Sequence, residues 1–239
     1  MRSCRYFGFL TCAASGTLLS SCAFLTYANP AQTPPVPTTP GAELKGKNLI
    51  LITVDTTRAD HISCYGGPKD LTPNIDALAA DGTLFLSAYS QTNVTNPSHT
   101  AILTGLLAID SRIFENRTAF LEACPKGDTL PQAFKRAGYR TAGFPATPHL
   151  SKAEKCLNLP GFDVYPEVPE GGGFDAAQIV DHVIEWLDTQ KPETPFFAWV
   201  HFFDPHMKYW PPEDYRNSVY PAGKDPRTGD NPPLGEDDN

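Results

Sequence analysis

The chain has 239 residues and a formal net charge of −8, with 41% hydrophobic and 19% charged residues. This length suits one sizeable α/β core, and the composition is that of an ordinary globular protein. The acidic balance excludes nucleic acid as a main partner, because phosphate binding needs clustered lysine and arginine. Half of the net charge lies in residues 213–239, where seven acidic residues face three basic ones, and we interpret this stretch as a solvated segment.

The first 22 residues have the pattern of an export signal. Arg2 and Arg5 precede a mostly apolar run over residues 7–19, which is shorter than the roughly 20 residues of a membrane span. Leu19-Ser20-Ser21-Cys22 resembles the lipobox of bacterial lipoproteins, in which the cysteine receives a diacylglycerol. A plain signal peptide is the alternative. We expect export to the cell envelope, with lipidated Cys22 anchoring the protein to a membrane on its non-cytoplasmic side, periplasmic or extracellular.

The remaining chain divides into a linker and a folded domain. Residues 23–46 are rich in proline and threonine, which predicts an extended spacer, and residues 47–239 form the domain. Its three cysteines, an odd number, allow at most one disulfide. We favour Cys124 with Cys156, because both lie in polar, loop-like surroundings, and this leaves Cys64 as a free thiol. No cysteine spacing typical of structural zinc is present.

The elements of the domain are predicted in chain order. Residues 48–54 are a strand buried on both faces, which ends at Asp55. Thr72 and Pro73 begin a helix that Gly82 ends, with Ile75, Leu78 and Ala79 as its buried stripe. The elements expected next are a short strand over 83–89, a helix over 97–105, a helix over 130–137 closed by Gly138, and a strand over 139–144.

The clearest helix pattern covers residues 175–189. Its apolar face is formed by Ala176, Ile179, Val180, Val183, Trp186 and Leu187, and Asp175 with Gln178 can form a capping box. The strand 195–201 follows. Strands that alternate with helices predict an α/β fold with a mainly parallel central sheet and helices on both faces. Ligands bind beyond the carboxyl ends of such strands, where Asp55 and the region of His201 lie. From residue 211 onward no periodic element follows, so we expect the fold to be incomplete at the C-terminus.

The chemistry is concentrated in Thr95-Asn96-Pro97-Ser98-His99. A hydroxyl at a helix start lies in the field of free backbone N–H groups, which favours an anionic oxygen or a bound phosphate or sulfate. Threonine alone is a poor nucleophile, and a divalent cation beside it lowers its pKa. Asp55 is the natural first ligand for that cation. Thr95 as a simple helix N-cap is the alternative.

Several segments, in unbroken order, resemble the sulfatase family of the alkaline-phosphatase superfamily. They are residues 48–61 (Asn-Leu-Ile-Leu-Ile-Thr-Val-Asp-Thr-Thr-Arg-Ala-Asp-His), 72–79, 95–99, where the family carries its nucleophile signature, and 195–206. The resemblance implies a metal-dependent hydrolase of sulfate or phosphate esters, acting on a small-molecule or glycan ester. It implies Asp55 as a metal ligand, Thr95 as the nucleophile and His206 facing the anionic group of the substrate. The implied ion is calcium first, with magnesium, manganese or zinc as alternatives.

The sequence departs from the family pattern in three ways. Threonine cannot be converted to the formylglycine of true sulfatases, but it is the nucleophile of phosphodiesterase relatives, so phosphoester or phosphonate cleavage or phosphoryl transfer is as well supported as sulfate cleavage. His99 replaces the signature arginine and remains a candidate catalytic residue. The family's later metal ligands would lie beyond Asn239, which leaves a catalytically inactive lipoprotein or a gene fragment as the alternative function.

Two further residue interpretations come from the local sequence. His201 ends a buried strand and is interpreted as a core histidine with its hydrogen bonds satisfied. Arg58 and Asp60 are expected to form a local salt bridge that shapes the loop after Asp55.

Overall fold

The computed structural model describes residues 45–118, 128–151, 159–169, 172–206 and 215. The signal peptide, most of the linker, and both Cys124 and Cys156 lie outside these residues, so the predicted disulfide does too. Cys64 is a free thiol. No helix in the described ranges is both long and apolar enough to cross a membrane.

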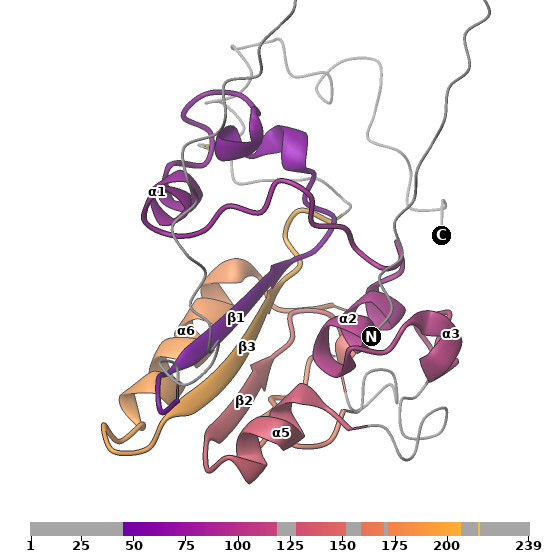
Figure 1. Cartoon of the computed structure of the whole chain (residues 1–239), viewed down its shortest axis with the longest axis vertical. Helices are drawn as coiled ribbons and strands as arrows, with labels where there is room; N and C mark the ends of the chain where they lie inside the picture. Colours follow the sequence, from indigo (N-terminus) through magenta and orange to yellow (C-terminus); the bar gives the residue numbers. More distant parts are fainter. Residues whose placement is uncertain (1–44, 119–127, 152–158, 170–171, 207–214, 216–239) are drawn as a thin grey trace, which may run out of the picture. The chain divides into compact units, whose positions relative to one another are not determined.

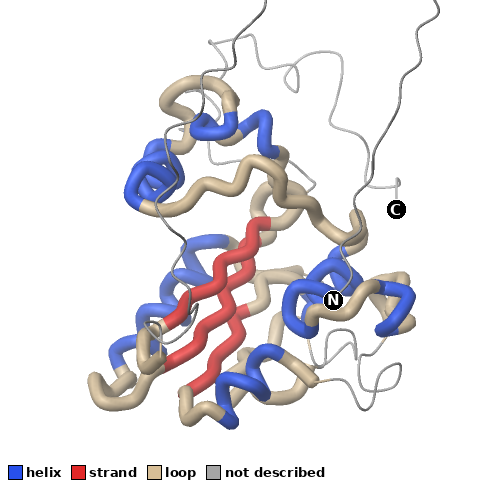
Figure 2. Tube along the Cα trace, viewed as in Figure 1, coloured by secondary structure: helices blue, strands red, loops and turns tan. Residues whose placement is uncertain are grey.

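A three-stranded parallel sheet forms the centre of the described part (Figures 1 and 2). Its strands are β1 (Leu49–Val54), β2 (Arg140–Phe144) and β3 (Phe196–Phe202), in the spatial order β1-β3-β2. β3 is aliphatic and aromatic and lies in the middle, buried along almost its whole length. The predicted parallel sheet is therefore confirmed, with strand bounds within one residue of the expected ones.

Helices cover both faces of the sheet, as expected. On one face, α2 (Thr95–Thr104) and α5 (Leu130–Arg136) contribute to a core around Phe197 and Trp199. On the other face, α6 (Ala176–Asp188) packs against Ala198 and Val200 through Ile179 and Trp186. Successive side chains of a strand point to opposite faces, so the alternating residues of β3 join the two cores together.

The helix starts and ends follow local sequence signals. Asp175 and Gln178 form the predicted capping box of α6. Thr129 and Gln132 form a second one at α5, which the sequence reading missed. Gly105 ends α2 with a φ of 71°, a left-handed conformation that glycine adopts without strain. The described part also contains α1 (Pro73–Asp81), the short helix α3 (Ala108–Ser111) and three turns of 3₁₀ helix at Ala59–His61, Ser63–Tyr65 and Pro148–Leu150.

Three burial predictions are wrong. β1 is an edge strand and not buried on both faces: Ile50, Ile52 and Val54 are 41–54% exposed, because α6 packs against β2 and β3. In α1, no residue is buried, since the helix packs mainly against the turn at Ser63–Tyr65 and not against the sheet. Val180 of α6 is 42% exposed.

Residues 83–89 do not form the expected strand. They pair with no strand, and the apolar side chains that suggested one are solvent-exposed: Phe85, Leu86 and Tyr89. Without a neighbouring strand, the backbone N–H and C=O groups of an isolated extended segment have no ladder to join.

Candidate active site

The site lies where β1 ends and α2 begins. Asp55 follows β1 directly, and its backbone N–H donates to the carbonyl of Phe202 on β3 at 2.9 Å, so the parallel ladder holds it. Thr95 is the first residue of α2 and has a half-buried side chain. Its hydroxyl donates to Oδ2 of Asp55 at 3.2 Å. The structure therefore brings together the predicted metal ligand and the predicted nucleophile, which are 40 residues apart in sequence.

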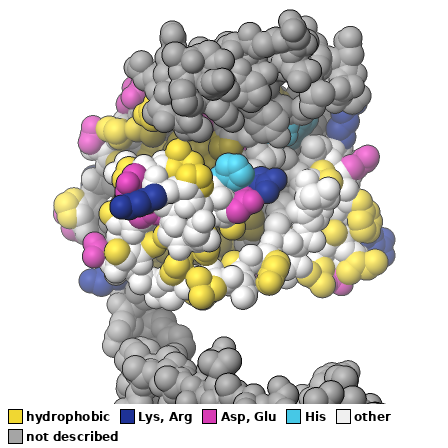
Figure 3. All heavy atoms as spheres, turned by 90° about the horizontal axis from the view of Figure 1, so that it is seen from above, with side chains coloured by type: hydrophobic (Ala, Val, Ile, Leu, Met, Phe, Trp, Pro, Cys, Tyr) yellow, Lys and Arg dark blue, Asp and Glu magenta, His cyan; other side chains and the backbone are white. Residues whose placement is uncertain are grey.

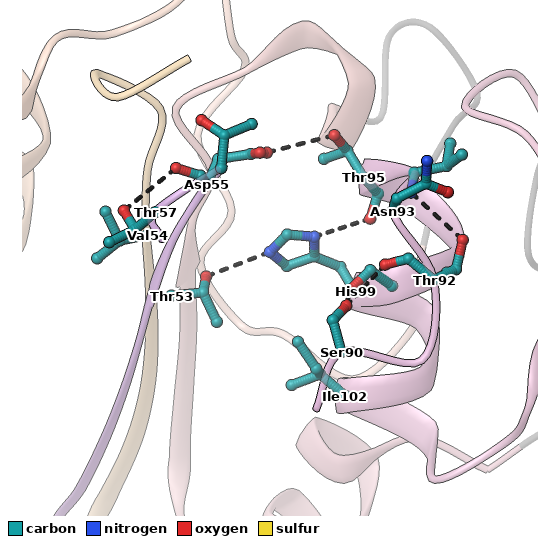
Figure 4. A pocket seen from close by; sticks show the side chains of 13 residues that line it. Thr53, Val54, Asp55, Thr57, Ser90, Thr92, Asn93, Thr95, His99 and Ile102 are labelled. Carbon is teal, nitrogen blue, oxygen red and sulfur yellow. Dashed lines mark hydrogen bonds between the residues drawn. The ribbon is translucent and has the colours of Figure 1, made fainter. Parts of the chain in front are cut away.

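The alternative that Thr95 caps α2 is wrong. The N-cap residue is Val94, and no side chain caps the helix. Thr95 points its hydroxyl across to the strand end (Figure 4). The backbone N–H of Asn96 donates to Oδ1 of Asn116, Pro97 has no N–H, and the N–H of Ser98 donates to the carbonyl of Val94. Among the described hydrogen bonds, none involves the backbone N–H of Thr95, and such an N–H at the start of a ten-residue helix favours an anion nearby.

The fully buried side chain of Asn96 anchors the first turn of α2 to the segment 116–118. Its side-chain amide donates to the carbonyls of Asn116 at 3.1 Å and Thr118 at 2.8 Å, and its backbone N–H donates to Oδ1 of Asn116 at 2.9 Å. Sequence reasoning did not single out Asn96, although a polar residue between a candidate nucleophile and a proline was a signal for such an anchor. These bonds fix the position of Thr95.

His99 lies one helical turn after Thr95 and bridges α2 to β1 (Figure 4). Its Nδ1 is 2.8 Å from the carbonyl oxygen of Thr95, and its Nε2 is 3.3 Å from Oγ1 of Thr53. Burial lowers the pKa of His99, against the opposing effect of the hydrogen bond to Thr95. A neutral imidazole here cannot replace the permanent positive charge of the arginine that the family signature carries.

His201 is fully buried, as expected for a core residue, but it is not a satisfied one, because its buried Nε2 has no hydrogen-bond partner. Its Nδ1 is 3.0 Å from Oγ1 of Thr53, and its Nε2 lies 3.7 Å from Oδ2 of Asp55. Burial, together with the neighbouring ring of His99, lowers the pKa of His201 to about 2. Thr53 and Trp199 complete this buried layer, because the indole N–H donates to the threonine hydroxyl at 3.0 Å.

His206 lies beyond the end of β3. Its ring stacks on that of Phe203 with centroids 4.3 Å apart, and its backbone N–H donates to the carbonyl of Phe203. It does not line the pocket described next. Its predicted role toward the anionic group of a substrate stays a prediction.

A pocket of about 450 Å³ opens over Asp55 and Thr95. The described part of its lining is rich in hydroxyl groups and includes no lysine or arginine: Thr53, Val54, Asp55, Thr56, Thr57, Ser90, Thr92, Asn93, Val94, Thr95, Ser98, His99 and Ile102. Arg58 follows Thr57 in sequence, but its guanidinium is paired with Asp60: Nη2 lies 2.6 Å from Oδ2, which is the salt bridge that the sequence predicted. Hydrogen bonds from Arg58 and His61 hold the pKa of Asp60 well below its usual range.

The backbone at the mouth of the pocket is strained. Thr56, next to Asp55, has a φ of 50°. This left-handed conformation is a genuine outlier for a β-branched residue, since its Cβ crowds the backbone. Such outliers gather at sites where the neighbouring structure fixes a functional side chain.

The described residues provide part of a donor set for a divalent cation. The carboxylate of Asp55 and the hydroxyl of Thr95 are hard oxygen donors side by side, and the buried Nε2 of His201 has no hydrogen-bond partner. Within the described ranges, no group of three or more histidine, cysteine, aspartate and glutamate side chains that could hold a metal occurs. A hard cation takes six or more ligands, so these residues fit a cation only as one side of its coordination shell.

Comparison with known proteins identifies the family. The sulfatase family model matches residues 47–231, so the chain belongs to the sulfatase family. It is 27% identical over 205 residues to N-acetylglucosamine-6-O-sulfatase of Bacteroides thetaiotaomicron, covering 75% of this chain and 35% of that protein. It is 28% identical over 209 residues to human iduronate 2-sulfatase, covering 73% and 38%.

Solved structures agree with this assignment. The phosphonate monoester hydrolase of Agrobacterium radiobacter superimposes with a TM-score of 0.59 at 25% identity, covering 73% of this chain and 44% of that one. A structure holding its substrate D-glucosamine-2-N,6-O-disulfate gives a TM-score of 0.59 at 26% identity, covering 70% and 36%. The fold is thus that of the alkaline-phosphatase superfamily. The chain spans just over a third of the length of these two curated relatives.

Proposed function

We propose that the protein is a metal-dependent hydrolase of sulfate or phosphate esters, with Thr95 as the nucleophile and Asp55 as a ligand of the cation. The observation that carries this proposal is the 3.2 Å hydrogen bond from the Thr95 hydroxyl to Asp55 at the floor of the pocket. It joins the nucleophile signature of the family to the carboxylate at the end of the first strand.

The chain's own residues support the following chemistry. The hydroxyl of Thr95 gives its proton to the carboxylate of Asp55 as its oxygen bonds to the sulfur or phosphorus of the ester, and the bond to the bridging oxygen breaks. The leaving oxygen takes up that proton and departs as the alcohol. Water then cleaves the sulfated or phosphorylated Thr95, which releases sulfate or phosphate and restores the hydroxyl. The backbone N–H of Thr95 and the dipole of α2 stabilise the anionic oxygens of the substrate. Asn96 and His99 hold Thr95 in place through their bonds to the loop after α3 and to Thr53. A bound cation would supply positive charge that lowers the pKa of the hydroxyl.

The lining of the pocket favours an ester that carries one negative charge. A doubly charged phosphate monoester calls for several fixed cations, and the lining residues that the structure describes include no lysine or arginine. Sulfate esters, phosphodiesters and phosphonate monoesters carry one charge. The likeness to a phosphonate monoester hydrolase and to sulfatases supports the same range of substrates.

The test is release of 4-nitrophenol by the full chain from 4-nitrophenyl sulfate, bis(4-nitrophenyl) phosphate and 4-nitrophenyl phenylphosphonate. Thr95→Val keeps the branched shape and removes the hydroxyl, so we expect kcat to fall by at least about 100-fold. Thr104→Val makes the same change at the other end of α2, outside the pocket, and is the matched control. Equal activity of Thr95→Val and Thr104→Val would refute Thr95 as nucleophile. Absence of both turnover and bound metal in the wild-type chain would support the non-catalytic alternative.

We also propose that lipidated Cys22 anchors the protein outside the cytoplasm. The support is the segment Leu19-Ser20-Ser21-Cys22 behind a short apolar run. In cells fed an alkyne-labelled fatty acid, the wild-type protein is expected to carry the label and Cys22→Ser to lose it. A label that persists in Cys22→Ser would place the lipid elsewhere.

A further inference from the structure

The hydroxyl of Thr53 lies at the centre of three ring nitrogens. Trp199 Nε1 is 3.0 Å away, His201 Nδ1 is 3.0 Å away and His99 Nε2 is 3.3 Å away. The rings of His99 and His201 touch edge to face, with centroids 4.5 Å apart. A hydroxyl donates one proton and accepts two hydrogen bonds, so three partners use all of its capacity.

This geometry fixes which nitrogens carry protons. Nδ1 of His99 faces the Thr95 carbonyl at 2.8 Å, and a carbonyl only accepts, so Nδ1 is the protonated nitrogen. In a neutral ring, Nε2 then accepts the proton of Thr53. The two lone pairs of the Thr53 hydroxyl accept the indole N–H of Trp199 and the Nδ1–H of His201. His201 is therefore left with a bare lone pair on Nε2.

That lone pair faces Asp55. Nε2 of His201 is buried without a hydrogen-bond partner and lies 3.7 Å from Oδ2 of Asp55, beyond hydrogen-bonding distance. Two electron-pair donors held face to face repel each other unless a proton, a water molecule or a cation lies between them, and a divalent cation is what the carboxylate of Asp55 is proposed to bind. Their separation is less than twice a zinc–ligand distance of about 2.1 Å, so both atoms can reach one ion.

We infer that His201 is a nitrogen ligand of the cation bound by Asp55, and that the site therefore prefers zinc to calcium. Imidazole suits zinc, whereas calcium takes oxygen ligands. Thr53 is a positioning residue, because its hydroxyl fixes the tautomer that leaves Nε2 of His201 free to bind. This inference rests on the proposed function and deepens it by naming the class of metal.

The competing arrangement reverses the proton chain. If His99 were a cation, its Nε2–H would donate to Thr53, Thr53 would donate to Nδ1 of His201, and Nε2 of His201 would carry a proton toward Asp55. That arrangement places a positive charge on a ring that is only 6% exposed. The two arrangements differ in one observable, the protonated nitrogen of His201.

The first test reads that nitrogen directly. In the metal-free full chain labelled with ¹⁵N-histidine, long-range ¹H–¹⁵N spectra are expected to show His99 and His201 both protonated on Nδ1. Addition of zinc chloride is expected to shift the Nε2 resonance of His201 and leave that of His99 nearly unchanged. A proton on Nε2 of His201, or zinc binding that leaves its resonance unmoved, overturns the inference.

The second test compares affinities by titration calorimetry with zinc chloride and calcium chloride. We expect His201→Gln to weaken zinc by about 100-fold and calcium by less than about threefold, and Thr53→Val to weaken zinc by about 10-fold. Thr104→Val is the control. If Asp55→Asn abolishes binding and His201→Gln changes neither ion, this inference fails while the proposed function stands. If neither ion binds the wild-type chain, both fail.

Discussion

Asp163 joins three parts of the described structure through one carboxylate. Lys135 of α5 lies 2.5 Å from its Oδ1, and the backbone N–H and hydroxyl of Thr141 on β2 donate to Oδ2 at 3.0 and 3.1 Å. Partial burial raises its pKa, but the hydrogen bonds from Lys135 and Thr141 outweigh this effect and hold the pKa below its usual value. The ionised form is therefore stabilised by folding.

Asp163→Asn is expected to lower the free energy of unfolding at pH 7 by about 1–2 kcal/mol. Because the folded-state pKa is depressed, the contribution is fully present above the unfolded pKa of about 3.9 and disappears as the pH falls through the folded-state value. Urea unfolding of the wild type and of Asp163→Asn at pH 7 and at pH 3 measures the difference in their free energy of unfolding. The gap between wild type and variant should narrow at pH 3, and an unchanged gap would contradict the assigned cause.

The sequence predicted Asp55 and Thr95 because each stands at a recognisable boundary, one at the end of a strand and the other at the start of a helix. Thr53 was missed, because a threonine within an aliphatic strand is usually a packing residue. Only the register of β1 against β3, which pairs Thr53 with His201, brings these two side chains together. Thr53 and His201 are 148 residues apart in sequence, so a local sequence pattern cannot predict that they are paired.

The helices α5 and α6 each begin with a capping box, but the two caps are expected to contribute differently to stability. The side chain of Asp175 accepts from the N–H of Gln178 at 2.8 Å at an exposed position. Thr129 accepts from the N–H of Gln132 at 3.2 Å, and its hydroxyl also donates to the carbonyl of Pro160 at 2.7 Å. Thr129 is only 2% exposed, so water cannot replace a lost bond there.

We expect Asp175→Ala to destabilise the protein by about 1 kcal/mol, the usual cost of losing a cap. Thr129→Ala should cost about 2 kcal/mol or more, because it also leaves the buried carbonyl of Pro160 unsatisfied. Urea denaturation of both variants gives the comparison. Equal losses would mean that the bond to Pro160 contributes nothing.

For the whole described part, the sheet has one uncovered edge. β1 pairs only with β3, and on the face that α6 leaves open its side chains Ile50, Ile52 and Val54 are 41–54% exposed. Figure 3 shows apolar side chains scattered among charged ones of both signs on the face it views. An exposed apolar edge strand is a template for pairing with another chain.

The full chain is therefore expected to self-associate through β1 as its concentration rises. Ile52→Lys places a charge in the middle of the exposed row and should shift the protein toward monomer. Sedimentation velocity over a range of concentrations measures the association, with Leu86→Lys, at an exposed position outside the sheet, as the control. A wild-type chain that stays monomeric throughout would show that this edge is not available for pairing.

The topology was more predictable than the packing. Alternation of strand and helix patterns is enough to indicate a parallel sheet, and the capping box of α6 fixed its start within one residue. The exposure of β1 was not predictable, since an aliphatic run such as residues 48–54 is the same whether the strand is central or at an edge. Which strand lies at the edge follows from the assembled sheet.

The left-handed backbone conformation of Thr56 lowers the stability of the folded protein. Glycine would adopt φ near 50° without steric conflict, so Thr56→Gly should relieve about 1 kcal/mol of strain and raise the melting temperature. The same change would give the backbone beside Asp55 more freedom. A thermal scan showing no gain would mean that Thr56 is held without cost. A gain would mean that Thr56 keeps its conformation at a cost in stability. Selection for heat resistance alone would then favour glycine at this position, and Asp55 would lose part of its fixed orientation.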